Sequence, residues 1–489
     1  MPHNYKLLFL NINLKTQQGQ ALFALLLLLT IGAGAAFFTL VKPANSAIER
    51  DKITAAALAQ AKAALIGYAT SVTLNPICSM PNCPRPGDLP CPDTNDNGSE
   101  GTSCGNTAGT TGQATRIGRL PWKTLGLPDL RDGDGERLWY AVSVNFKYNS
   151  RSSCGAPGDA GCLNSDSRGT ITVRNSAGTV IHEGANPDAF TPSGVIAVIF
   201  SPGAALRRQG AGTSQDRSCT GGSCTAAGVC NSSPTTLTPK CNPINYLDIL
   251  TGTEDNADFV DGSNTNGFIN GVIRDANNNI IVNDRLITIT YNDLMPVLQR
   301  RVAKEVLNCL GAYASANNGR YPWAVPVTDL TYRDAPNVRF GRIPDDNRLN
   351  ETANTAPAMM DRWPSDGTEC NLILSASWNN WKELVFYGVA DAYKPVSGLP
   401  AGGPCDGTSV CLRINPPSAT YDKRVIVAVA GKRLSASAYP AGLDQPRTSP
   451  ADKQNALNYL EGQNYTANPT NTYEQQPISA SFSDFLLYQ

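Results

Sequence analysis

The residues whose types and spacing best suit a chemical role lie in the segment 89–101, which reads LPCPDTNDNGSEG. Oxygen-bearing side chains alternate along this segment and precede Gly98, as they do in the front half of a calcium-binding loop. The four candidate ligands are Asp93, Asn95, Asn97 and Glu100. Cys104 occupies the twelfth position, where such a loop has its bidentate glutamate, so Glu100 would have to replace it. Calcium is the only cofactor that the sequence predicts.

The same residues have a second interpretation as a series of Asx turns, closed by a disulfide between Cys91 and Cys104. Two other acidic clusters are weaker candidates for calcium. They are Asp132, Asp134 and Glu136 in RDGDGER, and Glu254, Asp255, Asp258 and Asp261 further along the chain. Turn-forming aspartates account for many such clusters, so local turns are the alternative to calcium at all three places.

Catalysis by histidine has almost no support in this chain. Only two histidines are present, His3 and His182, and His182 follows the apolar residues TVI as at the end of a strand. Histidine-dependent triads and histidine-rich metal sites are therefore nearly excluded. The sequence also contains no GxSxG, HExxH or phosphate-loop pattern. We expect no enzymatic activity, although two carboxylates brought together by folding could serve a glycosidase.

The composition indicates a large protein that is rich in turns. The 489 residues include 43 Gly and 34 Pro, and this length suggests two or three domains. Charged residues make up 17% of the chain and the formal net charge is −1. No basic surface for nucleic acid is expected from these values.

The cysteines indicate an oxidising compartment. There are 14, an even number, and many lie close together in the chain, as in disulfide-bonded exported proteins. Zinc is the alternative, but the spacings are irregular and no histidine lies near them. Spacing suggests the pairs Cys154–Cys162, Cys219–Cys224, Cys230–Cys241 and Cys405–Cys411. Cys309 has no close partner in the sequence, so Cys370 is expected to pair with it. A buried free thiol at Cys309 is the alternative to the last pair.

An uncharged apolar run from Ala21 to Val41 places the chain relative to a membrane. At about 1.5 Å per helical residue, it is long enough to cross a hydrocarbon core of about 30 Å. The residues before it are polar and basic, with Lys6 and Lys15, and the cationic side of such a segment normally stays in the cytoplasm. The rest of the chain is therefore expected on the far side of the membrane.

The beginning of the chain resembles the type IV pilin and type II secretion pseudopilin family. A short basic leader ends in Gly19, an apolar helix follows from Gln20, and strong helix formers continue it over 48–69. The resemblance implies a leader at 1–19, which prepilin peptidase removes between Gly19 and Gln20, and a transmembrane and amphipathic helix over 20–70. It also implies a single-pass protein of the bacterial inner membrane, with its head in the periplasm or on the cell surface. Other pilin or pseudopilin subunits would be its partners.

One position departs from the family pattern. Ala24 is the fifth residue after the expected cleavage point, where most members carry a glutamate. In the family that carboxylate is thought to pair with the N-terminal ammonium group of a neighbouring subunit, and the tip pseudopilin of type II secretion machines also lacks it. Two alternatives remain for the N-terminus: an uncleaved signal anchor, and a secretory signal peptide cut at Ala33-Gly34-Ala35.

Two regions of the chain, with heads at 71–293 and 294–489, contain six similar segments in the same order, which indicates an internal duplication. Each copy has a helix, an apolar strand, a close cysteine pair, a second strand, an NYL segment and a closing strand. The matched strands include RLWYAVSVNF against WKELVFYGVADAY, and GVIAVIFSPGAAL against RVIVAVAGKRLSA. The predicted fold is α+β, with an N-terminal transmembrane helix and two tandem pilin-like modules, each a helix packed on an antiparallel sheet with disulfide-rich loops.

The second helix is predicted over Val297–Ala314, and its charges exclude it from spanning a membrane. Its apolar residues are expected to face the sheet: Val297, Leu298, Val302, Val306, Leu307 and Leu310. The phrases GRLPW from Gly118 and GRYPW from Gly319 suggest equivalent places in the two copies. Their tryptophans, Trp122 and Trp323, are expected to pack within their own module, the alternative being exposed recognition groups.

These inferences lead to two functional hypotheses. In the first, the protein is a non-enzymatic minor pilin or pseudopilin of an inner-membrane-anchored type IV pilus or type II secretion filament. A head with two modules would collide with subunits packed above it, so a position at or near the tip is expected. In the second, it is a membrane-anchored periplasmic or surface ligand-binding protein, such as an adhesin, that never enters a filament. The sequence favours the first, because apolar character persists past residue 35 and a further helix follows.

Overall fold

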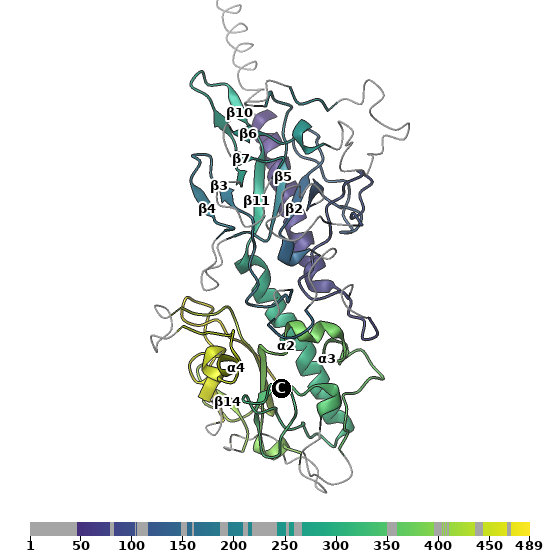
Figure 1. Cartoon of the computed structure of the whole chain (residues 1–489), viewed down its shortest axis with the longest axis vertical. Helices are drawn as coiled ribbons and strands as arrows, with labels where there is room; N and C mark the ends of the chain where they lie inside the picture. Colours follow the sequence, from purple (N-terminus) through teal and green to yellow (C-terminus); the bar gives the residue numbers. More distant parts are fainter. Residues whose placement is uncertain are drawn as a thin grey trace, which may run out of the picture.

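A computed structural model describes most of the chain beyond residue 45. The described residues are 46–78, 83–102, 104, 116–147, 154–158, 161–185, 194–208, 214–217, 242–250, 254–258, 267–349, 359–395, 403, 405, 407, 410–435, 444–466 and 471–489. They form an α+β structure in which two four-stranded sheets follow one another along the long axis of the molecule (Figure 1). Below, residues 46–289 are called the first half and residues 290–489 the second half.

The first half is built on an antiparallel sheet whose strands follow the order of the chain. They are β1 (Ile117–Arg119), β2 (Trp139–Val142), β5 (Ala197–Ser201) and β11 (Arg285–Ile289). A helix over residues 46–71 covers one face, and it shares a core with Tyr140 and Ile199. Ala61, Leu65 and Ala69, four residues apart on that helix, are fully buried. Small side chains at this spacing bring the helix close to the sheet.

The opposite face of this sheet is also covered, which explains why its central strands, β2 and β5, are buried at every position. Trp139 and Phe200 belong to a separate core on that side, together with Val173 and Phe268. The covering layer contains the three-stranded sheet of β3 (Val173–Arg174), β4 (Val180–His182) and β8 (Phe268–Ile269). Two hairpins complete this half: β6 (Ile249–Leu250) with β7 (Glu254–Asp255), and β9 (Ile273–Arg274) with β10 (Ile280–Val282). In β11, at the edge of the main sheet, only Ile289 is fully buried and the other four residues are partly buried.

The second half repeats this plan with helix α2 (Tyr291–Ala316) on a second antiparallel sheet. Its strands are β12 (Phe340–Arg342), β13 (Val385–Val389), β15 (Val425–Val429) and β17 (Phe485–Tyr488). The short elements of this half are α3 (Asn371–Leu374), α4 (Pro450–Lys453) and the parallel pair β14 (Arg413–Ile414) and β16 (Thr472–Tyr473). Short 3-10 turns lie at Val144–Phe146, Pro243–Asn245, Asp346–Arg348, Ala376–Asn380, Asp391–Tyr393, Ala456–Asn458 and Asn464–Thr466.

Helix α2 begins before the predicted start at residue 297, because Thr290 and Asp293 form a capping box at its N-terminus. The predicted boundary between residues 293 and 294 therefore falls within its first turn. Of the six residues expected to face the sheet, four are fully buried: Leu298, Val302, Val306 and Leu310. Leu307 is partly buried, whereas the prediction for Val297 is wrong, since it is 41% exposed. Val297 is rotated by about 100° from Leu298 around the helix, which turns it away from the core.

The two halves agree at the level of individual hydrogen bonds near the start of each sheet. The amide of Gly87 donates to the carbonyl of Ala69 (2.9 Å), and that of Gly319 donates to Ala314 (2.7 Å). The hydroxyl of Tyr140 donates to the carbonyl of Pro90 (3.2 Å). Its counterpart Tyr387 donates to Pro322 (2.8 Å). The turn at GRYPW thus corresponds to GDLPC at residues 87–91.

The predicted equivalence of GRLPW and GRYPW is therefore wrong. Gly118 and Arg119 lie in β1, which pairs with β2. The counterpart of β1 is β12, where Gly341 and Arg342 hold the same places in the pairing with β13. Gly319, by contrast, lies in the turn before β12. Strand pairing decides the equivalence, and a five-letter match cannot reveal it. Trp323 is buried in its own half as expected, and Trp122 packs against the loop at Gly98.

Helix α2 also joins the two halves. Its Asp293 carboxylate pairs with Lys62 of the first helix (2.8 Å). Arg301 donates to the carbonyls of Thr70 (3.0 Å) and Val72, at the end of the first helix. One hydrophobic core runs from the first helix through α2 to the second sheet. The first helix (purple) ends beside α2, at the junction of the two halves (Figure 1).

Disulfides occur in both halves. The described pairs are Cys78–Cys83, Cys91–Cys104, Cys154–Cys162, Cys309–Cys370 and Cys405–Cys411. Cys309 is therefore not a free thiol, and it connects α2 to the residue just before α3. The expected pairs Cys219–Cys224 and Cys230–Cys241 lie outside the described residues.

The expected membrane segment, residues 21–41, and the expected cleavage point between Gly19 and Gln20 also lie outside the described residues. Within the described part of the chain, no helix is both long and apolar enough to cross a bilayer.

Candidate functional site

The candidate calcium loop is held together by hydrogen bonds of its own. Asp93 Oδ1 accepts from the amide of Asn95 (3.0 Å), and Asp93 Oδ2 accepts from the amide of Gly98 (2.6 Å). Asn95 Oδ1 accepts from the amide of Asn97 (3.2 Å), and Asn97 Oδ1 accepts from that of Ser99 (2.7 Å). These are successive Asx turns, and the Cys91–Cys104 disulfide closes the segment. Desolvation by burial disfavours the charged form of Asp93 and therefore raises its pKa.

Glu100, the fourth candidate ligand, is partly buried, and this burial raises the pKa of its carboxyl. Among the described residues, no group of three or more His, Cys, Asp or Glu side chains is placed to hold a metal ion. The Asx turns give Asp93, Asn95 and Asn97 a structural role that needs no metal. Calcium at this loop stays a prediction.

The other acidic candidates have partners within the fold. Asp132 Oδ1 accepts from the amides of Asp134 (3.0 Å) and Glu136 (2.9 Å). Glu254 pairs with Arg174 (3.1 Å), and Asp255 pairs with Arg208. Asp258 is described and lies in the turn after β7, whereas Asp261 lies outside the described residues.

A buried polar network that the sequence interpretation missed lies at one end of the first sheet. Gln215 Nε2 donates to Asp248 Oδ1 (2.9 Å), and Gln215 Oε1 accepts from Arg217 Nη2 (2.8 Å). Asp284 Oδ2 accepts from the amide of Asp248 (2.7 Å) and from Asn256 Nδ2 (2.9 Å). In return, Asp248 Oδ2 accepts from the amide of Asp284 (3.2 Å). The two carboxyl groups therefore lock together the NYLD segment and the start of β11.

The second half contains the same network. Gln445 Nε2 donates to Glu461 Oε1 (3.0 Å), and Gln445 Oε1 accepts from Arg447 Nη2 (3.3 Å). Asp484 Oδ2 accepts from the amide of Glu461 (2.8 Å) and from Asn464 Nδ2 (2.9 Å). Glu461 Oε2 accepts from the amide of Asp484 (3.0 Å). Each residue occupies the place of its counterpart in the first half.

Both carboxyl pairs are held in a weakly solvated interior. Desolvation by burial raises the pKa of Asp248 to about 6. Desolvation, with the charge of Asp248, raises the pKa of Asp284 well above its usual value. In the second half, desolvation raises the pKa of both Glu461 and Asp484. The neutral form of one carboxyl is thus favoured in each pair, because two buried like charges repel each other.

Beside each carboxyl pair, a tyrosine ring contacts two guanidinium groups. The ring of Tyr246 lies 4.0 Å from the guanidinium of Arg119 and 5.0 Å from that of Arg217. Burial lowers the pKa of Arg119. In the second half, Tyr459 lies 5.1 Å from Arg342 and 4.8 Å from Arg447. The aromatic face favours these cations and partly offsets their loss of water.

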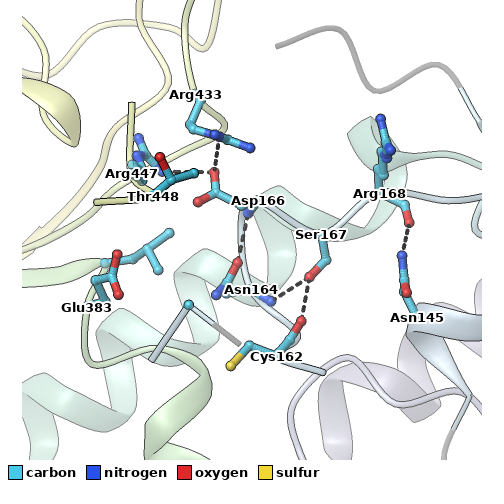
Figure 2. A pocket seen from close by; sticks show the side chains of 12 residues that line it. Asn145, Cys162, Asn164, Asp166, Ser167, Arg168, Glu383, Arg433, Arg447 and Thr448 are labelled. Carbon is cyan, nitrogen blue, oxygen red and sulfur yellow. Dashed lines mark hydrogen bonds and ion pairs between the residues drawn. The ribbon is translucent and has the colours of Figure 1, made fainter. Parts of the chain in front are cut away.

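In the second half, this arrangement borders a cleft of about 260 Å³ at the junction between the halves, here called the seam cleft. Figure 2 shows its lining, in which Asp166 of the first half points toward Arg447 and Arg433 of the second half. Arg447 Nη1 donates to Asp166 Oδ1 (2.9 Å), and Arg433 Nε lies 3.8 Å from the same oxygen. Asn164 Nδ2 donates to the carbonyl of Asn380 (2.8 Å), which fixes the loop that carries Asp166. An acidic side chain of one half is thus bound by arginines of the other.

The corresponding place in the first half is a second cleft of about 250 Å³, here called the arginine cleft. It is lined by Asp96, Arg119, Arg131, Glu136, Arg137, Arg217 and Tyr246. Trp139 pairs with Arg119 in the first sheet, and Phe386 pairs with the equivalent Arg342 in the second. Glu136 and Glu383 each lie three residues before these positions, so they are counterparts. Among the described residues that line the two clefts there is no histidine, and both linings combine arginines with carboxylates.

The sequence did contain a signal for these networks. QDR at 215–217 and QPR at 445–447 share the pattern Gln-x-Arg, and NYLD at 245–248 and NYLE at 458–461 share an acidic residue after NYL. In the sequence alone, the NYL segments indicate only the duplication. Their acidic residues gained a role once folding placed them beside Asp284 and Asp484, 36 and 23 residues later in the chain.

Searches with the chain found no matching family model, no matching curated protein and no matching solved structure.

Proposed function

We propose that the protein is a non-enzymatic minor pilin or pseudopilin subunit, anchored in the bacterial inner membrane and placed at or near the tip of a type IV pilus or type II secretion filament. One observation supports this most. The described helix at residues 46–71 is separated by four residues from the apolar run that ends at Val41, and it packs along one face of a four-stranded antiparallel sheet. An apolar segment followed by such a helix and sheet is what the resemblance to pilins implies.

The arrangement of the two halves supports a position at the tip. The second half adds a complete helix and sheet beyond the end of the first helix (Figure 1). It is tied to the first half by a shared core, by Arg301 and by the Asp166–Arg447 pair. A head of this size, held in one orientation, is sterically tolerated where no subunit packs above it. In this proposal the partners are other pilin or pseudopilin subunits, prepilin peptidase and the inner membrane.

The second candidate function is a membrane-anchored ligand-binding protein of the periplasm or cell surface. The arginine cleft is the observation that favours it, because a cleft lined by several guanidinium groups suits an anionic ligand. The two functions differ in the fate of the leader, which a filament subunit must lose.

The intact mass of the mature protein tests the first proposal. We expect the chain purified from its native membrane to begin at Gln20, and Gly19→Ala to block this processing. Gly32→Ala is the matched control, because it makes the same change within the apolar run and should leave processing unchanged. A mature chain that keeps its initiator methionine, or one that begins after Ala35, would refute the filament proposal.

A further inference from the structure

A short turn of the second half, Ala376–Asn380, is bound by backbone groups of the first half. Asn379 Nδ2 donates to the carbonyl of Gly155 (3.0 Å). Asn380 Oδ1 accepts from the amide of Leu163 (2.8 Å). Both side chains thus reach across the junction, and the position of the turn depends on where these two backbone groups lie.

One disulfide, Cys154–Cys162, lies beside both of these backbone groups and is here called the seam disulfide. Gly155 directly follows its first cysteine, and Leu163 directly follows its second. A disulfide restricts the relative movement of the segments that it joins. The seam disulfide therefore holds the two groups at the separation that the turn of the second half requires.

Lys453 adds a contact from the second half to the same loop. Its Nζ donates to the carbonyl of Pro157 (3.0 Å) and pairs with Glu383 Oε2 (2.9 Å). The loop lies close against this ammonium group, because a Cβ added to Gly158 would clash with Lys453 Nζ. Gly158 and Glu383 both line the seam cleft. The loop closed by the seam disulfide is thus part of the wall of that cleft.

The two cysteines of the seam disulfide differ in accessibility. Cys154 is fully buried, whereas Cys162 is partly buried and lines the seam cleft, where Figure 2 shows its sulfur. By contrast, both cysteines are buried in Cys91–Cys104 and in Cys309–Cys370. Access to the attacked sulfur is one of the factors that set the rate of thiol–disulfide exchange. A thiol that enters the seam cleft can therefore reach Cys162 before it reaches these buried bonds.

We propose that the seam disulfide is a redox latch, which a protein dithiol opens from the seam cleft. A thiolate of the dithiol attacks Sγ of Cys162, the bond between the two cysteine sulfurs breaks, and Cys154 leaves as a thiolate. The second thiol of the dithiol then attacks the mixed disulfide and releases Cys162. The dithiol is oxidised to a disulfide, and the two protons that it loses convert Cys154 and Cys162 to thiols.

Opening the latch loosens the wall of the cleft without separating the two halves. Gly155 and Leu163 are no longer held together, so Asn379 and Asn380 lose partners at fixed positions. The core that joins the halves through α2 does not include the seam disulfide, and neither does the contact of Arg301 with the end of the first helix. The latch therefore controls the seam cleft alone. It is independent of the membrane anchor and of leader processing.

Hydrogen–deuterium exchange of the full-length protein in detergent tests the structural half of the proposal. In the double variant Cys154→Ser with Cys162→Ser, amides of residues 376–384 should exchange at least about fivefold faster than in the unaltered chain. Amides of α2 should be unchanged, because the shared core stays intact. The matched control is Cys405→Ser with Cys411→Ser, which opens another short loop that has one partly buried cysteine. Its residues are not in the lining of the seam cleft, so residues 376–384 should be unaffected.

The chemical half is tested on the unaltered protein with dithiothreitol as the dithiol, followed by alkylation and peptide mapping. We expect Cys154 and Cys162 to be alkylated at least about tenfold faster than Cys309 and Cys370. The proposal is overturned if these two pairs react at equal rates, or if the double variant exchanges at residues 376–384 like the unaltered chain. Equal acceleration of these residues by the control variant would also overturn it. So would faster exchange throughout α2 in the double variant, since the halves would then not stay joined.

Discussion

Replacing Asp284 with asparagine should remove much of the pH dependence of stability in the first half. Asp284 is fully buried, and its Oδ2 accepts from the amide of Asp248 (2.7 Å) and from Asn256 (2.9 Å). Its Oδ1 is buried and has no hydrogen-bond partner among the described residues. An asparagine carbonyl can accept both of these hydrogen bonds, while its amide replaces the unpartnered oxygen without bringing a charge.

Asp284→Asn removes the titration of Asp284, whose pKa is raised by desolvation and by the charge of Asp248, and the pKa of Asp248 gives the scale of such a shift. The pKa of Asp248 rises from 3.8 to about 6 in the folded state. Because the folded state holds this proton more tightly than the unfolded state, the stabilisation is present below pH 4 and is lost as the pH rises through 6. A shift of about two units corresponds to about 3 kcal/mol, at about 1.4 kcal/mol per unit. The raised pKa of Asp284 extends the loss to higher pH.

The assay is chemical unfolding followed by tryptophan fluorescence between pH 4 and pH 8.5. The measured quantity is the difference in free energy of unfolding between Asp284→Asn and the unaltered chain, because other carboxyl groups cancel in this difference. We expect the two proteins to be about equally stable near pH 4. At pH 8 the variant should be more stable by about 1–3 kcal/mol, since it no longer places two negative charges together.

Three substitutions complete this test. Asp484→Asn should behave in the same way, because it is the counterpart of Asp284 in the second half. Asp284→Ala should destabilise the protein by about 1–3 kcal/mol for each buried donor left without an acceptor. Asp275→Asn, at an exposed position whose pKa is lowered by hydrogen bonds from Asn279, should not show the gain at high pH. A difference that is independent of pH, or one in which Asp284→Asn is less stable at pH 8, would refute the reasoning.

Three further predictions concern other parts of the fold. Asp166→Asn should weaken the contact with Arg447 (2.9 Å) and lower the free energy of unfolding by about 1–3 kcal/mol. The double variant with Arg447→Ala should lose less than the sum of the two single losses, because both substitutions remove the same contact. Gly341→Ala should destabilise by about 1–3 kcal/mol or more, because a Cβ would lie 1.8 Å from the Val325 carbonyl oxygen, whereas Gly67→Ala, with no atom within 4 Å, should be neutral or stabilising. Adding a calcium chelator should leave the melting temperature unchanged if the Asx turns at Asp93 need no metal, whereas a fall that added calcium reverses would show that the loop binds it.

Much of the plan of this protein could be predicted from local sequence. Apolar runs located β2, β5, β13 and β15, because strands buried on both faces have few polar positions. The ordered repeats predicted two copies of a helix and sheet, and spacing predicted the pairs Cys154–Cys162 and Cys405–Cys411. Local hydrogen bonding also explains the Asx turns, since each involves residues two to five positions apart.

The paired networks were not predicted, because their members are far apart in the chain. Asp248 and Asp284 are 36 residues apart, and Asp166 and Arg447 are 281 apart. Equivalence between the copies was misjudged for the same reason. GRYPW resembles GRLPW in letters, but the strand pairing shows a different equivalence. Gly341 and Arg342 in β12 pair with β13 as Gly118 and Arg119 in β1 pair with β2.

The amino-acid sequence by itself determined the apolar run before Lys42, the main helix and strands of each half and the existence of two copies, because each depends on composition or on short-range periodicity. The tertiary structure alone decided how the copies differ in use. It placed Asp166 of one half against Arg447 of the other, and it left the matching cleft of the first half lined by that half alone. Burial then gave the carboxyl pairs their raised pKa values, since removal from water is a property of the fold and not of any residue type.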